Sequence, residues 1–91
     1  MSLDSKSVDE LLTQLIGTST SVWEIKSRLR ELFPDPHVTI SVIESILNGQ
    51  DIDAIYIAIY DRYSVIHLEL HCSSGKWQST NARRCVTFQV G

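Results

Sequence analysis

The chain of 91 residues has little glycine and proline, and it has no long hydrophobic run. Only four Gly and two Pro argue against a disordered or low-complexity protein. No apolar stretch approaches the roughly 20 residues of a membrane-spanning helix, so we expect no membrane association. The polar, acidic N-terminus lacks the pattern of a secretory signal, which favours a cytoplasmic setting. There Cys72 and Cys85 would be free thiols, although the sequence leaves a disulfide between them open.

A surplus of basic residues is also absent, because the formal net charge is −3. Proteins that bind a phosphate backbone usually carry excess positive charge, since the release of counterions supplies much of their affinity. The charge therefore disfavours nucleic acid as a partner, although a local basic patch can act against the net sign.

Sequence motifs of catalysis are missing as well. The chain has no glycine-rich phosphate loop, no Gly-x-Ser-x-Gly nucleophile motif and no pair of carboxylates in a suggestive setting. An enzyme needs acidic, basic or metal groups that converge on a pocket. We therefore expect a protein that is not an enzyme and that uses no cofactor.

Two stretches near the N-terminus have the apolar spacing of amphipathic helices. Each begins with the Ser-x-x-Glu spacing of a capping box, and each ends at a residue that stops helices. The predicted helices are 7–16, ended by Gly17, and 21–33, ended by Pro34. Residues 1–6 are predicted to form a flexible leader.

A third helix is predicted between Thr39 and Asn48. Apolar residues recur there at i, i+3, i+6 and i+7, and Asn48-Gly49 is typical of a helix end. The β-branched residues of this stretch lower its helical propensity, so a strand is the alternative.

Beyond this stretch the hydrophobic period changes from that of a helix to that of a strand. Isoleucine alternates with alanine or tyrosine over 54–60, and aliphatic residues alternate with more polar ones over 65–72. Residues 61–64 would join these strands in a β-hairpin. A brief strand is expected within 77–80 and a last strand at 85–90. The chain is therefore predicted to be one α+β domain, with three N-terminal helices packed on one face of a C-terminal antiparallel sheet of three to four strands.

The domain itself would cover residues 7–91, and its sheet would present exposed aromatic side chains. Tyr56 and Tyr60 alternate with the isoleucines and so lie on the face opposite them. Because Tyr and Trp are enriched at protein interfaces, we interpret the chain as a protein-interaction or regulatory module. The predicted partner-binding residues are Tyr56, Tyr60, His67, Glu69 and Trp77. The alternative is that these aromatics only cover the sheet or fill the core.

An exposed edge strand of the sheet would be a second route to a partner. Such a strand can pair with a strand of another protein, or with a second copy of the chain in a homodimer.

A metal site is a further alternative to the main prediction of none. His67, Glu69 and His71 fall on one strand face, where neighbouring positions lie roughly 7 Å apart. Zinc bound by His67 and His71 would need a third ligand, for which Cys85 or His37 are candidates. The simpler interpretation is a polar, solvated sheet face.

Residues 21–72 also carry a resemblance to a known family. The stretch from Ser21 to Leu29, then Phe33-Pro34, then Thr39 to Leu47, resembles the second and third helices of winged helix-turn-helix regulators, in particular those of the ferric-uptake type. The hairpin would then be the wing.

This resemblance implies a nucleic-acid-binding regulator as the alternative function. The residues that would contact nucleic acid are Lys26, Arg28, Arg30, Ser41, Ser45, Arg62, Arg83 and Arg84. Two features disfavour it: the expected recognition helix has no Lys or Arg, and it carries Glu44.

Overall fold

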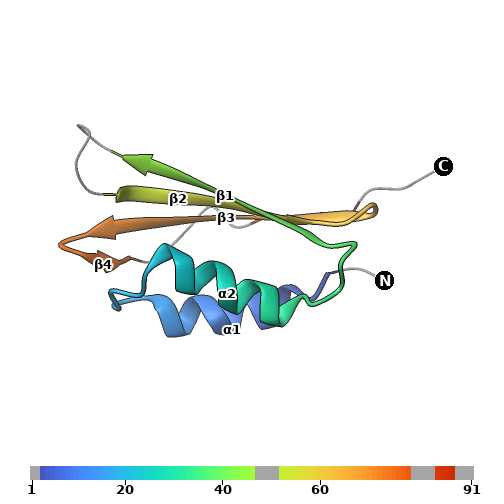
Figure 1. Cartoon of the computed structure of the whole chain (residues 1–91), viewed down its shortest axis with the longest axis horizontal. Coiled ribbons are helices and arrows are strands. Elements are labelled where there is room, and N and C mark those ends of the chain that lie inside the picture. Colours follow the sequence, from blue (N-terminus) through green and yellow to red (C-terminus); the bar gives the residue numbers. More distant parts are fainter. Residues whose placement is uncertain (1–2, 47–51, 79–83, 88–91) are drawn as a thin grey trace.

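The computed structural model describes residues 3–46, 52–78 and 84–87, which form two helices followed by five strands (Figure 1). The helices are α1 (Ser5–Leu15) and α2 (Val22–Leu32); the strands are β1 (Thr39–Ile46), β2 (Ile52–Tyr60), β3 (Ser64–Ser73), β4 (Lys76–Trp77) and β5 (Arg84–Thr87). This order confirms the predicted α+β class. Each of the two described helices has eleven residues, and neither is long and apolar enough to cross a membrane.

Side-chain caps fix where both helices begin. The Asp4 carboxylate caps α1, because it accepts hydrogen bonds from two backbone N–H groups of the first turn and from the Ser7 hydroxyl at 2.6 Å. The prediction that Ser7 caps this helix is therefore wrong. The helix begins at Ser5, within the segment predicted to be a flexible leader. Leu3 already belongs to the core. The predicted cap of α2 is confirmed, since the Ser21 hydroxyl accepts the Glu24 N–H at 3.2 Å.

The prediction of a third helix is wrong, because Thr39–Ile46 forms strand β1. Five of its eight residues are β-branched, and such side chains pack better on a pleated sheet than on a helix. The strand pairs antiparallel with β2, with Thr39 opposite Tyr60. Asn48-Gly49 was interpreted as a helix end, but the same dipeptide is also typical of hairpin turns. It lies outside the described residues.

The strands form one antiparallel sheet in the order β1-β2-β3. The predicted hairpin of β2 and β3 is confirmed, with Ile57 opposite Leu68 near its centre. β4 and β5 pair with different ends of β3, β5 with residues 64–67 and β4 with residues 72–73. Of the predicted last strand, residues 88–90 lie outside the described part of the chain. β1 is therefore an edge strand of the described sheet.

The core lies between the sheet and the two helices, which cover the same face of it (Figure 1). The isoleucines of β2 and the aliphatic residues opposite them in β3 supply the sheet side: Ile55, Ile57, Ile59, Ile66, Leu68 and Leu70. Val8, Leu15, Ile25 and Leu29 supply the helix side. Each such side chain stabilises the fold by about 1.5–3 kcal/mol through its burial. The period-2 pattern of the sequence thus correctly identifies the helix-facing side of the hairpin.

Trp77 joins the short strand β4 to the connection between the helices. Its backbone N–H donates to the Thr18 carbonyl at 3.0 Å, and its carbonyl accepts the Gly17 N–H at 2.7 Å. Its indole Nε1–H donates to the Thr20 carbonyl at 2.7 Å. Only 4% of its surface is exposed. Trp77 is thus a core residue that anchors the helices to the sheet.

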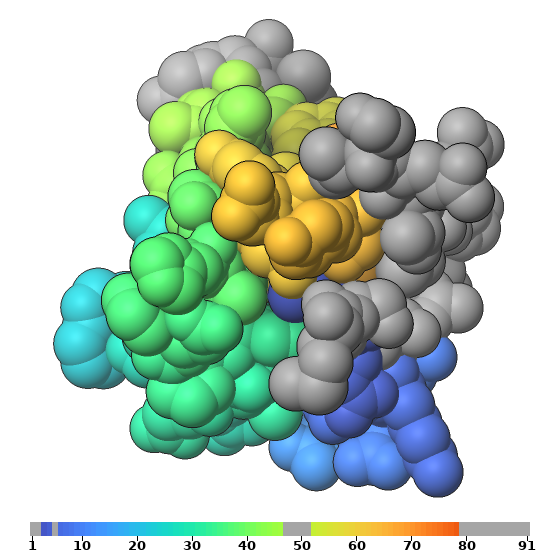
Figure 2. All heavy atoms as spheres, turned by 90° about the vertical axis from the view of Figure 1, so that its right-hand side faces the viewer, coloured from blue at the N-terminus to red at the C-terminus, as the bar shows by residue number. Residues whose placement is uncertain are grey.

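The turn between β2 and β3 is held by one carboxylate. Asp61 accepts the backbone N–H groups of Tyr63 at 2.8 Å and Ser64 at 2.9 Å. These hydrogen bonds lower the pKa of Asp61 below its ordinary value, because they stabilise the charged form, and the bond from Tyr63 has the largest effect. Figure 2 shows this end of the molecule, where the turn stands beside the green segment that leads into β1. The buried Ser64 hydroxyl also accepts the Leu3 N–H at 3.4 Å.

We predict that Asp61→Ala destabilises the protein by about 1–2 kcal/mol at neutral pH, because the turn loses its acceptor. The folded pKa of Asp61 is lowered, so this stabilisation is present above the unfolded pKa of about 3.9 and is lost as the pH falls through the folded pKa. Urea unfolding of both proteins between pH 7 and pH 2 should therefore show a difference that shrinks at the acid end. A difference that does not change with pH would contradict this assignment.

The two tryptophans should differ strongly in solvent access. Trp23 has 76% of its surface exposed, whereas Trp77 is buried. With Trp23→Phe, the remaining fluorescence should be blue-shifted and poorly quenched by acrylamide. With Trp77→Phe, it should be red-shifted and readily quenched, and stability should fall by about 1 kcal/mol as the indole hydrogen bond is lost. Equal quenching of the two variants would place Trp77 outside the core.

Candidate functional site

The sheet face opposite the helices, called the outer face below, carries exposed apolar and aromatic side chains. Tyr56 and Tyr60 of β2 are each 41% exposed, and Ile43 of β1 is 64% exposed. Ile43 and Tyr56 are directly opposite each other in the register, so their side chains are neighbours. A solvated face of an antiparallel sheet is usually polar, and this cluster departs from that pattern.

Small residues beside this cluster create a hollow in the outer face. Ala58 alternates with the two tyrosines along β2, and its register neighbours are Ser41 in β1 and His67 in β3. The short side chains of Ser41 and Ala58 therefore lie next to the row formed by Ile43, Tyr56 and Glu69. The hollow has a volume of about 280 Å³, and its lining is Ser41, Ile43, Tyr56, Ile57, Ala58, His67, Leu68 and Glu69. It can receive an apolar side chain of a partner.

Four of the five predicted partner-binding residues meet on this face: Tyr56, Tyr60, His67 and Glu69. The fifth, Trp77, lies in the core and is not part of the surface. The sequence analysis missed Ile43, because the predicted helix placed it on a buried stripe with Ile40. Reading 39–46 as a strand separates these two residues, since they are three positions apart and so face opposite sides.

The polar side of the outer face is formed by β3. The Glu69 carboxylate and the His71 imidazole are 2.6 Å apart between Oε2 and Nε2. Glu69 is also the register neighbour of Tyr56. Glu69 is therefore held in place beside the aromatic cluster, where it can accept hydrogen bonds from a partner.

Within the described part of the chain, the two histidines of the alternative zinc site do not converge. His67 and His71 lie four residues apart on β3, which is about 13 Å along an extended strand and too far for one metal ion. The predicted spacing of about 7 Å applies only to positions two apart. Cys85 lies opposite Ile66 rather than opposite either histidine, and the exposed His37 precedes β1 in the chain. The described residues contain no group of three or more ligands that could hold a metal.

Among the described residues, those expected to contact nucleic acid lie on different elements and do not form one surface. Ser41 and Ser45 lie on the outer face, and Arg62 is in the turn, where its guanidinium carbon lies 5.5 Å from the centre of the Tyr63 ring. Arg28 pairs with Glu24 on α2, 3.7 Å apart. Arg84 begins β5, and Arg83 lies outside the described residues. The segment expected as the recognition helix is strand β1.

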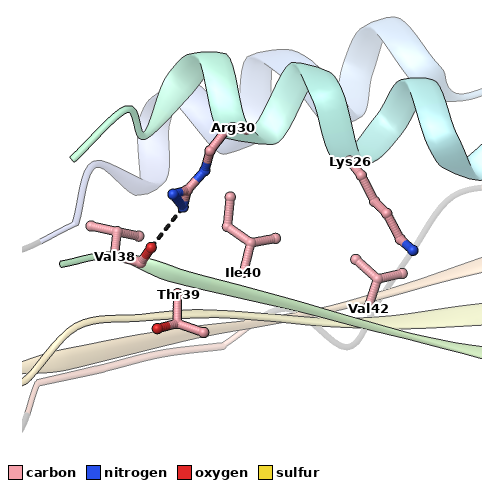
Figure 3. Close-up of a pocket in the computed structure, with 6 residues that line it drawn as sticks. All are labelled: Lys26, Arg30, Val38, Thr39, Ile40 and Val42. Atoms are coloured by element: carbon pink, nitrogen blue, oxygen red, sulfur yellow. Dashed lines mark hydrogen bonds between the residues drawn. The ribbon is translucent and has the colours of Figure 1, made fainter. Parts of the chain in front are cut away.

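Lys26 and Arg30, also among those residues, line a groove between α2 and β1 (Figure 3). Both side chains reach from the helix toward the strand, where Ile40 and Val42 point up at them. The groove has a volume of about 460 Å³. The Arg30 guanidinium donates to the Val38 carbonyl at 2.6 Å, which fixes the start of β1 against the helix.

We predict that Arg30→Ala destabilises the protein by about 1–2 kcal/mol, because a charge-assisted hydrogen bond to β1 is lost. Arg28→Ala is the matched control. Its ion pair with Glu24 is solvent-exposed, so it should cost less than about 0.5 kcal/mol. Urea unfolding and amide hydrogen exchange in β1 measure both effects. Equal losses in the two variants would show that the bond to Val38 contributes nothing specific.

Comparison with known proteins identifies no relative of the chain. No protein family, no characterised protein and no solved structure matches the chain at a significant level. The resemblance to winged helix-turn-helix regulators therefore stays a prediction from residues 21–72.

Proposed function

We propose that the chain is a non-enzymatic protein-interaction module that binds a partner protein through the outer face of its sheet. The observation that carries this proposal is the exposed pair Ile43 and Tyr56, which lines a hollow in the outer face, with Tyr60 exposed further along the same strand. Exposed apolar clusters with a polar rim are typical of protein-binding sites.

The architecture leaves this face available. Both described helices pack on the opposite face of the sheet, so the apolar residues there are already used in the core (Figure 1). Within the described residues no element covers Ile43 or Tyr56, and both remain accessible. Tyrosine loses little conformational entropy on binding and presents both an apolar ring and a hydroxyl. These properties favour a binding role for the face.

The lining of the hollow indicates what the partner brings. An apolar side chain would fill the space above Ala58, beside Ile43 and Tyr56. His67 and Glu69 would meet polar groups at the rim, because both lie on the β3 side of the hollow. The partner surface is therefore expected to have an apolar centre and hydrogen-bonding groups on one side.

The test compares variants of the immobilised protein in quantitative affinity capture. Tyr56→Ser removes an aromatic ring, and Ala58→Leu fills the hollow; each should reduce recovery of the captured protein at least about tenfold, as expected for the centre of an interface. Tyr63→Ser is the matched control, since Tyr63 is also 41% exposed but lies in the turn. The control should keep wild-type recovery.

Two results would overturn the proposal. One is a captured protein whose recovery is the same with Tyr56→Ser, Ala58→Leu and the control. The other is salt-sensitive binding of a mixed-sequence DNA duplex that is lost in the Arg28→Ala, Arg62→Ala variant, because this outcome would favour the nucleic-acid alternative.

A further inference from the structure

We propose that the chain forms a symmetric dimer in which the β1 strands of two copies pair antiparallel along their free edges. This inference concerns the edge of the sheet and does not rest on the outer face binding a partner. It follows from three observations: the unpaired edge of β1 in the described sheet, the side of α2 that lies above this edge, and the charges on both.

The free edge of β1 carries no Lys or Pro that would discourage strand pairing, and its register irregularity falls at its end, between Ser45 and Ile46. β1 pairs with β2 on one side, and no described strand pairs with its other side. Natural edge strands are commonly short or carry Lys or Pro, which discourage pairing. β1 has eight residues, TISVIESI, without Lys, Arg or Pro. Alternate residues of such a strand direct backbone N–H and C=O groups outward, where another strand can use them.

A stripe of α2 stands above this edge. Trp23, Lys26 and Arg30 are spaced i, i+3 and i+7, so they lie along one side of the helix. Figure 3 shows Lys26 and Arg30 reaching over Val42 and Ile40. Trp23 lies about one turn further along, and its side chain is largely exposed. A strand added to β1, about 4.8 Å away, would have its helix-side residues covered by this stripe.

The charges of the edge are complementary to one another. Within the described residues, neither Lys26 nor Arg30 forms an ion pair with a carboxylate, and Glu44 has no cationic partner. Glu44 is opposite Ile55 in the register and therefore lies on the helix side of β1, as Val42 does. The chain thus supplies both the basic stripe and an acidic residue on the strand that would pass beneath it.

Symmetry restricts the register of such a pair. Residues directly opposite each other must face the same side of the sheet, so a two-fold axis has to pass through one residue position. An axis at Ile43 places the two Ile43 side chains against each other on the outer face. It also places Glu44 opposite Val42 of the second copy, beneath the Lys26 of that copy. Each dimer would then contain this Lys26–Glu44 contact twice.

A second copy is favoured over an unrelated strand because β1 itself supplies the apolar residue and the acidic residue that the edge and the basic side of α2 can contact. Pairing would bring the exposed Ile43 side chains of the two copies into contact beside their hollows, cover the exposed Trp23 and neutralise Lys26 with Glu44. It would also join the two sheets, so that their hollows lie on either side of the Ile43 seam. The Lys26–Glu44 contact lies on the helix side, away from the outer-face hollow.

Sedimentation equilibrium of the wild-type protein should show a mass that rises from 10.3 kDa toward twice that value as the concentration increases. Glu44→Lys and Lys26→Glu should each raise the dissociation constant at least about tenfold, because both contacts of the dimer then become repulsive. An equimolar mixture of these two variants should restore association, since every contact in the mixed dimer again joins opposite charges.

Glu31→Lys is the matched control. It makes the same charge change on α2, but Glu31 lines the hollow between the two helices and not the groove at β1. It should dimerise like the wild type, and circular dichroism should show that all variants are folded. Ile43→Lys should also be monomeric. A wild-type mass of one copy up to millimolar concentration would overturn the proposal. So would dimers that tolerate both charge reversals, or a mixture that fails to associate.

Discussion

The alternation of isoleucine with alanine or tyrosine along β2 is the constraint on which the rest of the structure depends. Because successive side chains of a strand point to opposite faces, Ile55, Ile57 and Ile59 all require cover on one side. Both described helices provide that cover and pack on the same face. Tyr56 and Tyr60 are then placed on the other face by the same pleat, so the core and the candidate binding surface have one origin.

Local signals were sufficient for much of this fold. The cap at Ser21 and the hairpin at Asp61 depend on residues within a few positions of each other, and the sequence predicts both correctly. The prediction for the segment 39–46 is wrong, because Ile40, Ile43 and Ile46 have helical spacing, and the pairing with β2 that decides the structure cannot be seen within the segment itself. The burial of Trp77 depends on contacts with Gly17, Thr18 and Thr20, which local patterns do not contain.

The candidate site also combines features that local sequence determines with features that strand pairing determines. Alternation alone assigns Tyr56, Tyr60, His67 and Glu69 to one face, and the structure places all four there. The hollow above Ala58 arises from the lateral register that sets Ser41 and His67 beside it, and this register is fixed only when three strands are paired. Similarly, Lys26 and Arg30 are ordinary surface residues of a helix until β1 is placed beneath them. Long-range pairing therefore determines the shape of the surfaces, while local sequence determines their composition.

The contacts of Trp77 also bear on the order in which the chain can acquire its structure. The indole hydrogen bond to Thr20 joins residues that are 57 positions apart, and both helices precede Trp77 in the sequence. During synthesis the helices therefore leave the ribosome before Trp77, which anchors them. Their apolar faces stay uncovered until β2 and β3 have been synthesised. Such non-local closure slows folding relative to a helical bundle of similar size. A nascent chain that stops before β2 would expose these faces to chaperones and to other unfinished chains.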